Sequence, residues 1–325
     1  MQAYTIKTVH DQSVVELVER DEPELGPTQM RIQMHAASLN RGEFIVGHGL
    51  HGKSEVPQPV GLEGAGLVLE IGADVKHFAV GQRVMGRCPG AFAVHTIMEE
   101  REAMPIPDTL NWNEAAAVPL TYLTAYDAIH EQGRLKKGEW LLINGVTSGV
   151  GVAALQMGKA IGAHVIGTSG STDKLAKLQG QGLSLSLHTR QADFHDAVMH
   201  ATQGKGVDLV VNTVGGSVFA EDIRCLGFEG RLAMVGYVDG SLNTPLDLHA
   251  LHAKRLCLFG VSNKLRSAAQ KAASIPAFMK DIWPAMNRGE IRPFIDQVFP
   301  FSQLAQAKDS MQANNHVGKV VLSMP

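Results

Sequence analysis

The chain has 325 residues, with 29 lysines and arginines against 32 aspartates and glutamates, which gives a formal net charge of −3. Hydrophobic residues make up 45% and charged residues 19%, values typical of globular proteins. This balance excludes a disordered chain, a coiled coil and a strongly basic nucleic-acid binder, and the length allows about two domains. The 34 glycines are the clearest excess over ordinary composition.

The three cysteines, Cys88, Cys225 and Cys257, are too few and too far apart for a disulfide framework or a four-cysteine zinc site. A chain of this kind suits a reducing compartment, and we expect a cytoplasmic protein. Its first residues show no basic start followed by an apolar run, so no secretory signal is predicted. The uncharged stretch 140–158 contains four glycines and also Asn144, Thr147, Ser148 and Gln156, so we expect no membrane span there.

Residues 1 to about 120 are expected to be rich in β-strands. Short strand-like runs, such as 30–36 and 64–71, alternate with turn signals such as Leu25-Gly26-Pro27. Strands of this length and spacing predict an open barrel or a sandwich. The segment 113–131 is rich in helix formers, and Pro119 is predicted to separate two helices.

From residue 140 onward, apolar runs alternate with helical segments. Runs that are apolar throughout and separated by helices are typical of parallel strands buried on both faces. The predicted strands are 140–145, 164–169, 185–189, 208–214, 230–237 and 255–262. Units of this kind predict a doubly wound α/β domain. Beyond about residue 266 the sequence predicts helices, followed by a final strand over 318–324.

A glycine-rich loop follows the first of these strands and opens a helix. It reads Asn144-Gly145-Val146-Thr147-Ser148-Gly149-Val150-Gly151. The glycines permit a tight turn and a close approach of the backbone, and the helix N-terminus offers free N–H groups. With a second strand about 20 residues further on, the loop predicts a site for the pyrophosphate of a dinucleotide. A structural glycine turn in another kind of α/β protein is the alternative.

The end of the second strand predicts which dinucleotide binds. A site for NAD usually has an acidic residue there, which holds the ribose 2′-hydroxyl. Here the strand ends in Thr168, Ser169 and Gly170, and Lys174 lies in the first turn of the next helix. A cation in the first turn of a helix is unfavourable because it opposes the helix dipole. A bound 2′-phosphate, which is an anion, would explain why a lysine is found there. The sequence therefore predicts NADPH, the alternative being a solvated Lys174 balanced by Asp173.

Further motifs follow one another in a characteristic order. They are Ala37-Ser38-Leu39-Asn40, 61–66 (Gly-Leu-Glu-Gly-Ala-Gly), 80–84 (Val-Gly-Gln-Arg-Val), 123–126 (Leu-Thr-Ala-Tyr), 212–216 (Asn-Thr-Val-Gly-Gly), 230–232 (Gly-Arg-Leu) and 318–321 (Gly-Lys-Val-Val). Together with the glycine-rich loop, they make the chain resemble the medium-chain dehydrogenase/reductase superfamily, in its zinc-free quinone oxidoreductase (zeta-crystallin-like) branch. The resemblance covers nearly the whole chain.

The resemblance implies an α/β fold of two domains. Residues 1–123 and 266–325 would form a β-rich GroES-like barrel domain for the substrate, and residues 124–265 a Rossmann domain for NADPH. The active cleft would lie between the two. The strand 255–262 corresponds to the usual dimer edge of this superfamily, which implies a homodimer. An internal edge protected by its own charges is the alternative.

The resemblance also bears on metal binding. Zinc-dependent relatives carry a cysteine near Asn40 and Arg41, a histidine where this chain has Leu62, and another cysteine near Leu120. Glu63 alone cannot hold zinc, which takes three protein ligands in a catalytic site, so we expect no metal. Without a Lewis acid, oxidation of a plain alcohol is not expected. Hydride addition to a conjugated carbonyl needs only hydrogen-bond donors for the enolate.

By the same resemblance, Asn40 and Thr124 would lie beside the nicotinamide and act in catalysis. The other cofactor-binding residues would be Thr147, Ser148, Gly149, Val150, Gly151, Ser169, Gly170, Lys174, Asn212, Val214, Gly236, Tyr237 and Asn263. The alternatives are a turn-capping Asn40, a Thr124 that only packs its helix, and structural hydrogen bonds at Asn212 and Tyr237.

Many relatives of this branch carry tyrosines shortly after Asn40, and this chain has none over 41–51. His51 is a candidate to replace one as catalytic proton donor or hydrogen-bonding group, because histidine titrates near neutral pH. The alternative is that His48 and His51 are polar loop residues only.

We therefore expect an NADPH-dependent reductase that transfers hydride to a quinone or an α,β-unsaturated carbonyl. Its partner would be a small molecule, with neither nucleic acid nor membrane involved. Two alternatives stay open, an enoyl-thioester reductase of the same superfamily and a non-catalytic NADPH-binding protein. The enoyl-thioester reductase would need a wide apolar cleft and a cationic patch for the carrier phosphates.

Overall fold

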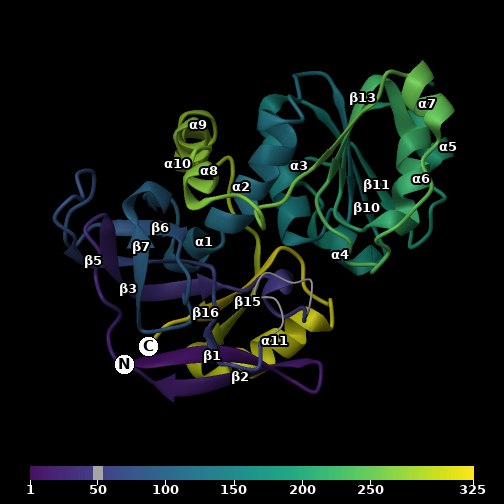
Figure 1. Ribbon diagram of the computed structural model, residues 1–325. Coiled ribbons are helices and arrows are strands. Elements are labelled where there is room, and N and C mark those ends of the chain that lie inside the picture. Colours follow the sequence, from purple (N-terminus) through teal and green to yellow (C-terminus); the bar gives the residue numbers. More distant parts are fainter. Residues whose placement is uncertain (47–53) are drawn as a thin grey trace. The chain divides into compact units, whose positions relative to one another are not determined.

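The computed structural model describes residues 1–46 and 54–325, which form two compact units (Figure 1). Unit 1 consists of Met1–Leu120 and Arg266–Pro325, and unit 2 consists of Thr121–Leu265. Within the described residues, no helix has the length and apolar character needed to cross a membrane.

Unit 2 is built on a six-stranded parallel sheet with the order β11-β10-β9-β12-β13-β14. Its strands are β9 (Trp140–Asn144), β10 (His164–Ser169), β11 (Leu185–His188), β12 (Val207–Asn212), β13 (Leu226–Met234) and β14 (Cys257–Gly260). The central strands β9 and β12 are buried almost throughout, which explains why their sequences are apolar at successive positions. The order runs outward from β9 in both directions and confirms the doubly wound α/β fold.

Helices cover both faces of this sheet (Figure 1). On one face α3 packs against β9 and β10, α4 packs against β10 and β11, and η3 lies beside α3. On the other face α6 contacts β12 and β13 and lies between α5 and α7. These segments are η3 (Asp127–Glu131, a π-helical turn), α3 (Gly149–Ile161), α4 (Thr172–Lys177), α5 (His195–Ala201), α6 (Gly216–Cys225) and α7 (Leu248–Ala253). Helix α2 (Pro119–Tyr126) directly precedes η3.

Strand β13 differs from the predicted range 230–237, because it begins at Leu226 and ends at Met234. Its first part carries an irregularity in its register with β12. Beyond its end, the N–H of Gly236 donates to the carbonyl oxygen of Asn212 at 3.3 Å. The chain therefore turns across the end of β12 instead of extending the strand.

Within its described residues, unit 1 contains a seven-stranded sheet and a three-stranded sheet. The larger has the order β15-β16-β3-β5-β6-β8, with β7 also paired to β3, and the smaller has the order β2-β1-β4. The strands are β1 (Gln2–Val9), β2 (Gln12–Glu19), β3 (Gln29–Ser38), β4 (Gln58–Pro59), β5 (Glu63–Ile71), β6 (Arg83–Arg87), β7 (His95–Glu99), β8 (Ala103–Pro105), β15 (Ile295–Pro300) and β16 (Lys319–Ser323). This unit agrees with the predicted β-rich, GroES-like part of the fold.

The helical segments of unit 1 are short. They are η1 (Arg41–Glu43), η2 (Glu100–Glu102), α1 (Trp112–Ala116), α8 (Ala268–Ala272), α9 (Ile275–Asp281), α10 (Trp283–Asn287), η4 (Phe301–Gln303) and α11 (Leu304–Gln312). The predicted break at Pro119 is confirmed, because α1 ends at Ala116 and α2 begins at Pro119. Proline is tolerated there because the first residue of a helix needs no backbone donor.

Strand β3 is central to unit 1 because three other strands pair with it. β5 follows most of its length, β7 pairs with its first half, and β16 pairs with its last residues. Met30, Ile32 and Met34 alternate along β3 into the core and are almost fully buried. The end of β3 therefore meets the beginnings of β5 and β16, which brings polar residues from distant parts of the sequence together.

Candidate functional site

The glycine-rich loop joins β9 to α3 at the carboxyl edge of the parallel sheet. Gly145 has a φ of 76°, in the left-handed region, and a Cβ there would lie 2.5 Å from Thr213 Oγ1. A Cβ at Gly151 would lie 2.4 Å from the carbonyl oxygen of Gly145. Ser148 caps α3, its Oγ accepting from the Gly151 N–H at 3.0 Å. The tight loop thus exposes a helix N-terminus that has no acidic residue in its first turn, as a phosphate requires.

Hydroxyl groups and a lysine gather at the end of the neighbouring strand β10. Thr147 Oγ1 lies 3.4 Å from Ser169 Oγ, and both residues are buried. Ser171 caps α4 by accepting from the N–H of Lys174 at 3.4 Å, so Lys174 lies in the first turn as predicted from the sequence. No acidic side chain occupies the strand end itself. This composition suits a 2′-phosphate better than a 2′-hydroxyl.

Arg190 is a candidate cofactor residue that the sequence analysis missed. Its Nε donates to the carbonyl oxygen of Gly170 at 2.9 Å, which holds the guanidinium beside the end of β10. A Cβ at Gly170 would lie 2.6 Å from Arg190 Cγ, so the glycine leaves the space that the arginine occupies. The signal that could have found it is its place just after β11, because the carboxyl ends of parallel strands meet at one edge.

Asn212, at the end of β12, is fully engaged by protein groups. Its Oδ1 accepts from the N–H groups of Val214 and Gly215 at 2.9 and 2.8 Å. Its Nδ2 donates to the carbonyl oxygen of Gly215 at 3.0 Å and to Asp222 Oδ2 at 2.8 Å. An amide has two donors and two acceptor lone pairs, so none is left for a ligand. Asn212 therefore shapes the turn that carries Val214.

Asp222 of α6 ties this turn to the glycine-rich loop. Its carboxyl group is fully buried and accepts from the side-chain amides of Asn212 and Asn144, the latter being the last residue of β9. Asn144 Oδ1 accepts in turn from Thr168 Oγ1 at 2.9 Å. Burial raises the pKa of Asp222 well above its usual range, and the two amide donors only partly oppose this. One carboxyl group thus connects the ends of β9, β10 and β12.

The remaining predicted residues lie at other places in the described chain. Gly236 and Tyr237 follow β13, and Asn263 follows β14, so they share the carboxyl edge of the sheet with the glycine-rich loop. Thr124 lies in α2. His51, the predicted proton donor, lies outside the described residues, as does His48.

In unit 1 a buried polar cluster forms where β3 ends and β5 and β16 begin. Glu63 Oε1 accepts from Ser38 Oγ at 2.8 Å and from Asn40 Nδ2 at 2.9 Å. The same oxygen accepts from Lys319 Nζ at 3.0 Å, and Lys319 also donates to Asn40 Oδ1 at 2.7 Å. Glu63 Oε2 accepts from the backbone N–H of Leu120 at 2.7 Å. Asn40 is thereby bound into an ion pair between two almost fully buried charges.

The residues around this cluster do not fit zinc. Leu62 and Leu120, at or near two positions where the resemblance would put zinc ligands, have hydrocarbon side chains, and the amide oxygen of Asn40 accepts from Lys319. Cys88 is fully buried, and burial raises the pKa of its thiol. Among the residues that the structure describes, no three histidines, cysteines, aspartates or glutamates group as metal ligands.

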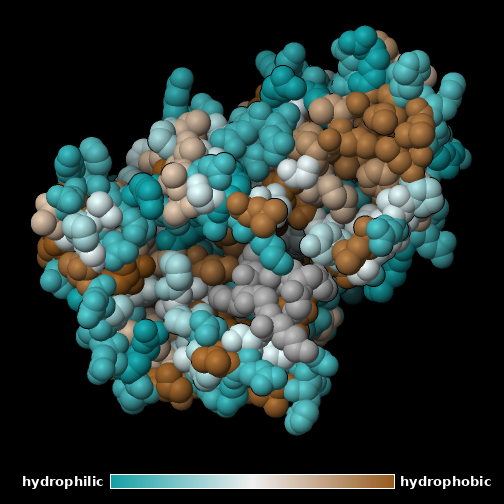
Figure 2. Space-filling model, in the orientation of Figure 1, coloured by the Kyte–Doolittle hydropathy of each residue, from teal (hydrophilic) through white to brown (hydrophobic). Residues whose placement is uncertain are grey.

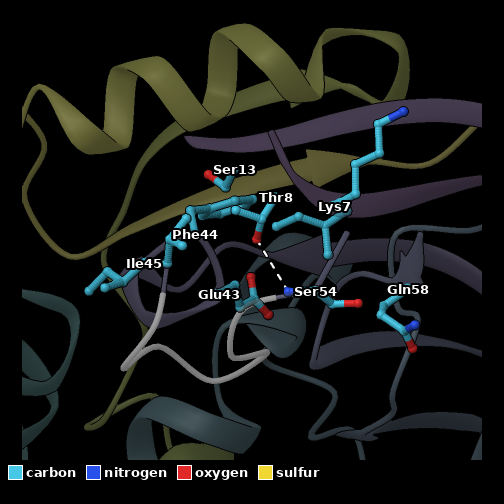
Figure 3. A pocket seen from close by; sticks show the side chains of 10 residues that line it. Lys7, Thr8, Ser13, Glu43, Phe44, Ile45, Ser54 and Gln58 are labelled. Carbon is cyan, nitrogen blue, oxygen red and sulfur yellow. Dashed lines mark hydrogen bonds between the residues drawn. The ribbon is translucent and has the colours of Figure 1, made fainter. Parts of the chain in front are cut away.

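A second buried carboxyl group, that of Glu43, lies next to Asn40. Its Oε2 accepts from the N–H of Asn40 at 3.2 Å, and its Oε1 has no partner among the described residues. Glu43 lines a cavity of about 20 Å³ together with Thr8 and Ser54, which are joined by a hydrogen bond (Figure 3). The cavity has room for about one water molecule. Burial raises the pKa of Glu43 to about 8, and the charge of Glu63 adds to this.

This pKa predicts how stability changes with pH. Between its unfolded pKa, about 4.3, and pH 8, Glu43 ionises more readily in the unfolded chain, so a rising pH favours unfolding. Glu43→Gln should remove that effect. The difference in free energy of unfolding between the variant and wild type should therefore shift in favour of the variant by at least about 1.4 kcal/mol from pH 5 to pH 8. Urea unfolding at several pH values measures it, with the exposed Glu55→Gln as control. Parallel curves for wild type and Glu43→Gln would show that Glu43 is already ionised in the fold.

Two family models match the chain. The model described as alcohol dehydrogenase GroES-like domain matches residues 26–108, which lie in unit 1. The model described as zinc-binding dehydrogenase matches residues 149–275, most of which lie in unit 2.

Individual proteins are similar over nearly the whole chain. A phenolphthiocerol/phthiocerol polyketide synthase of Mycobacterium tuberculosis is 33% identical over 298 residues, which cover 91% of this chain but only 14% of that protein. A solved NAD-dependent alcohol dehydrogenase is 28% identical, with a TM-score of 0.87 and 100% of both chains covered. The CurK enoyl reductase is 26% identical, with a TM-score of 0.84 and the same coverage.

Proposed function

Because the chain belongs to the medium-chain dehydrogenase/reductase superfamily of oxidoreductases, we propose that it transfers hydride from NADPH to a quinone or an α,β-unsaturated carbonyl without zinc. The Asn40 cluster is the observation that carries this proposal. It offers an amide donor next to a buried ammonium, where zinc-dependent relatives have metal ligands. A hydrogen-bond donor can stabilise an enolate oxygen, whereas the alkoxide of a plain alcohol calls for a Lewis acid.

The carboxyl edge of unit 2 fits NADPH. Its loop would receive the pyrophosphate on the N–H groups of Gly149 and Val150 at the start of α3. Ser169, Lys174 and Arg190 would bind the 2′-phosphate, the arginine through parallel N–H groups. When bound, NADPH supplies the hydride from its nicotinamide ring.

The choice of cofactor can be tested at Lys174 and Arg190. Each alanine variant should raise the NADPH dissociation constant about tenfold or more, because a hydrogen bond to a charged group contributes about 1.5–3 kcal/mol. NADH binding, which involves no 2′-phosphate, should change far less. Fluorescence titration with both cofactors measures this, with Lys205→Ala, before β12 at the opposite edge of the sheet, as control. Equal losses for NADPH and NADH would contradict the assignment.

An enoyl thioester is the second candidate substrate. It is favoured by the similarity to polyketide synthases and to the CurK enoyl reductase. The reaction is the same conjugate addition of hydride, and the two candidates differ in what the carbonyl group is attached to. A non-catalytic NADPH-binding protein is the third reading, and it predicts binding without turnover.

A substrate panel distinguishes these candidates. NADPH absorbance would be followed with 1,4-benzoquinone, 9,10-phenanthrenequinone, 2-alkenals and a crotonyl thioester, and NADP⁺ reduction with a simple alcohol. We expect turnover of a quinone or a 2-alkenal that a chelator does not abolish. Turnover of the thioester alone would select the second candidate. Activity with the alcohol alone, or only with added metal, would contradict the proposal.

A homodimer through β14 is part of the same proposal. β14 forms one edge of the sheet, and edge strands leave backbone groups open to pairing. Figure 2 shows an apolar patch over the part of unit 2 that carries the labels β13 and α7 in Figure 1. Phe228 in β13 and Leu248 in α7 are each 68% exposed, which is typical of a surface that a partner covers. The cytoplasmic location stays a prediction.

A further inference from the structure

The side-chain amide of Asn40 has partners of opposite kinds on its two ends. Lys319 Nζ, which can only donate, lies 2.7 Å from Oδ1, and a carboxylate oxygen of Glu63, which accepts, lies 2.9 Å from Nδ2. Rotating the amide by half a turn would set N–H groups against an ammonium and a carbonyl oxygen against a carboxylate. The two charged residues therefore fix which end of the amide is the nitrogen.

The two charged residues are themselves fixed. Lys319 Nζ uses its three donors on Asn40, Glu63 and the carbonyl oxygen of Leu39 at 2.9 Å. Glu63 also accepts from the hydroxyl group of Ser38 and from the backbone N–H of Leu120. Glu63 is 0% exposed and Lys319 is 5% exposed, so water does not compete for either charge. Removing one charge would leave the other buried and unpaired, which proteins tolerate poorly.

Asn40 is also held through its backbone, whose N–H donates to Glu43 at 3.2 Å. The residue is only half-buried, unlike the pair that holds it. Its Nδ2 carries two hydrogens and donates to Glu63 at 2.9 Å, and the carboxyl group of Glu43 also interacts with this side chain. Lys319 occupies the Oδ1 end of this half-buried amide, so a ligand that approaches the Nδ2 end meets an N–H.

We propose that Lys319 and Glu63 are positioning residues that hold Asn40 so that it presents only a hydrogen-bond donor to the substrate carbonyl oxygen. This inference rests on the proposed reduction of a conjugated carbonyl. In that step the hydride forms a C–H bond at the β-carbon, and NADPH is oxidised to NADP⁺. The π electrons move toward the carbonyl oxygen, and water later protonates the α-carbon. A donor at that oxygen stabilises the growing charge, and an amide oxygen in its place would repel it.

Lys319→Met removes the ammonium while keeping the length of the side chain. It should lower kcat about 10- to 100-fold, the usual cost of losing a group that orients a donor. The double variant Glu63→Gln/Lys319→Met carries no unpaired charge and should recover thermal stability without recovering kcat. Arg231→Met is the matched control, because it breaks the partly buried ion pair with Glu139 in unit 2 and should leave kcat within about twofold.

Action through Asn40 can be separated from a general structural role. In an Asn40→Ala background the further change Lys319→Met should cost no additional activity, because the group it positions is already gone. Additive losses would overturn the inference, and so would a folded Lys319→Met, or a folded double variant, that retains wild-type kcat.

A second readout needs no activity. The side-chain amide signals of Asn40 in a ¹⁵N-labelled NMR spectrum can be assigned by their loss in Asn40→Ala. We expect one sharp pair in wild type and a shifted or broadened pair in Lys319→Met, since the amide is then free to rotate. Unchanged signals would overturn the inference. If wild type reduces no conjugated carbonyl while the signals change as expected, the fixed orientation stands and the proposed reaction fails.

Discussion

Asp222→Ala should lower the free energy of unfolding by about 3–5 kcal/mol, because two buried amide donors lose their acceptor at a cost of about 1–3 kcal/mol each. These donors are the side chains of Asn144 and Asn212, and the space left by the carboxyl group adds to the loss. The variant should also weaken NADPH binding, since both partners lie beside the glycine-rich loop or the turn after β12. Urea unfolding and a fluorescence titration measure the two effects.

Asp222→Asn sharpens this test. An asparagine keeps the shape but can accept from only one of the two amides, so it should cost less than alanine and more than a surface change. Asp196→Ala is the control, because the Asp196 side chain is 98% exposed and its loss should stay within about 0.5 kcal/mol. If Asp222→Ala unfolds at the same urea concentration as this control, the network does not support the sheet edge.

Gly151→Ala is expected to have the second large effect. The added Cβ would meet the carbonyl oxygen of Gly145 at 2.4 Å and the backbone of Val146 at 2.7 Å, and neither can move without opening the loop. We expect a loss of about 1–3 kcal/mol in stability from this overpacking. NADPH affinity should fall about tenfold or more, because a displaced loop loses hydrogen bonds to the charged pyrophosphate that contribute about 1.5–3 kcal/mol each.

Gly260→Ala is the matched control for Gly151→Ala, since among the described residues of one chain no atom lies within 4 Å of the Cβ it adds. Gly260 belongs to β14, so size-exclusion chromatography must show that both variants keep the oligomeric state of wild type. It should change stability and NADPH affinity little. If Gly151→Ala binds NADPH as tightly as Gly260→Ala does, the close approach of the backbone at Gly151 is not part of the cofactor site.

Much of the fold was predictable because its signals are local. The predicted strand 164–169 has the bounds of β10, and Pro119 begins α2, because apolar runs and proline act through neighbouring residues. The glycine-rich loop was predictable for the same reason, since a left-handed backbone at Gly145 requires glycine. The start of β13 at Leu226 was not, because an irregular register with β12 is set by pairing between strands.

The site was harder to predict because its contacts are long-range. Lys319 meets Glu63 across 256 positions of sequence, and Asp222 meets Asn144 across 78. No spacing rule connects residues this far apart. Lys319 and Glu63 meet because β16 and β5 both pair with β3. Asp222 reaches Asn144 because α6 packs against β12 and β13. Asn212 is a different case, because three of its four side-chain bonds are to residues two or three positions away. The sequence left open whether Asn212 is a cofactor residue or a structural one, and its amide is used by the turn that it holds.

The most direct test of hydride transfer uses NADPH deuterated at the transferred position of nicotinamide C4. The protein would be incubated with this cofactor and a 2-alkenal, and the product analysed by mass spectrometry and NMR. The proposed reaction predicts one deuterium per product molecule, at the β-carbon, and a solvent hydrogen at the α-carbon. Deuterium on the carbonyl carbon of an alcohol product, or a product with no deuterium, would contradict it.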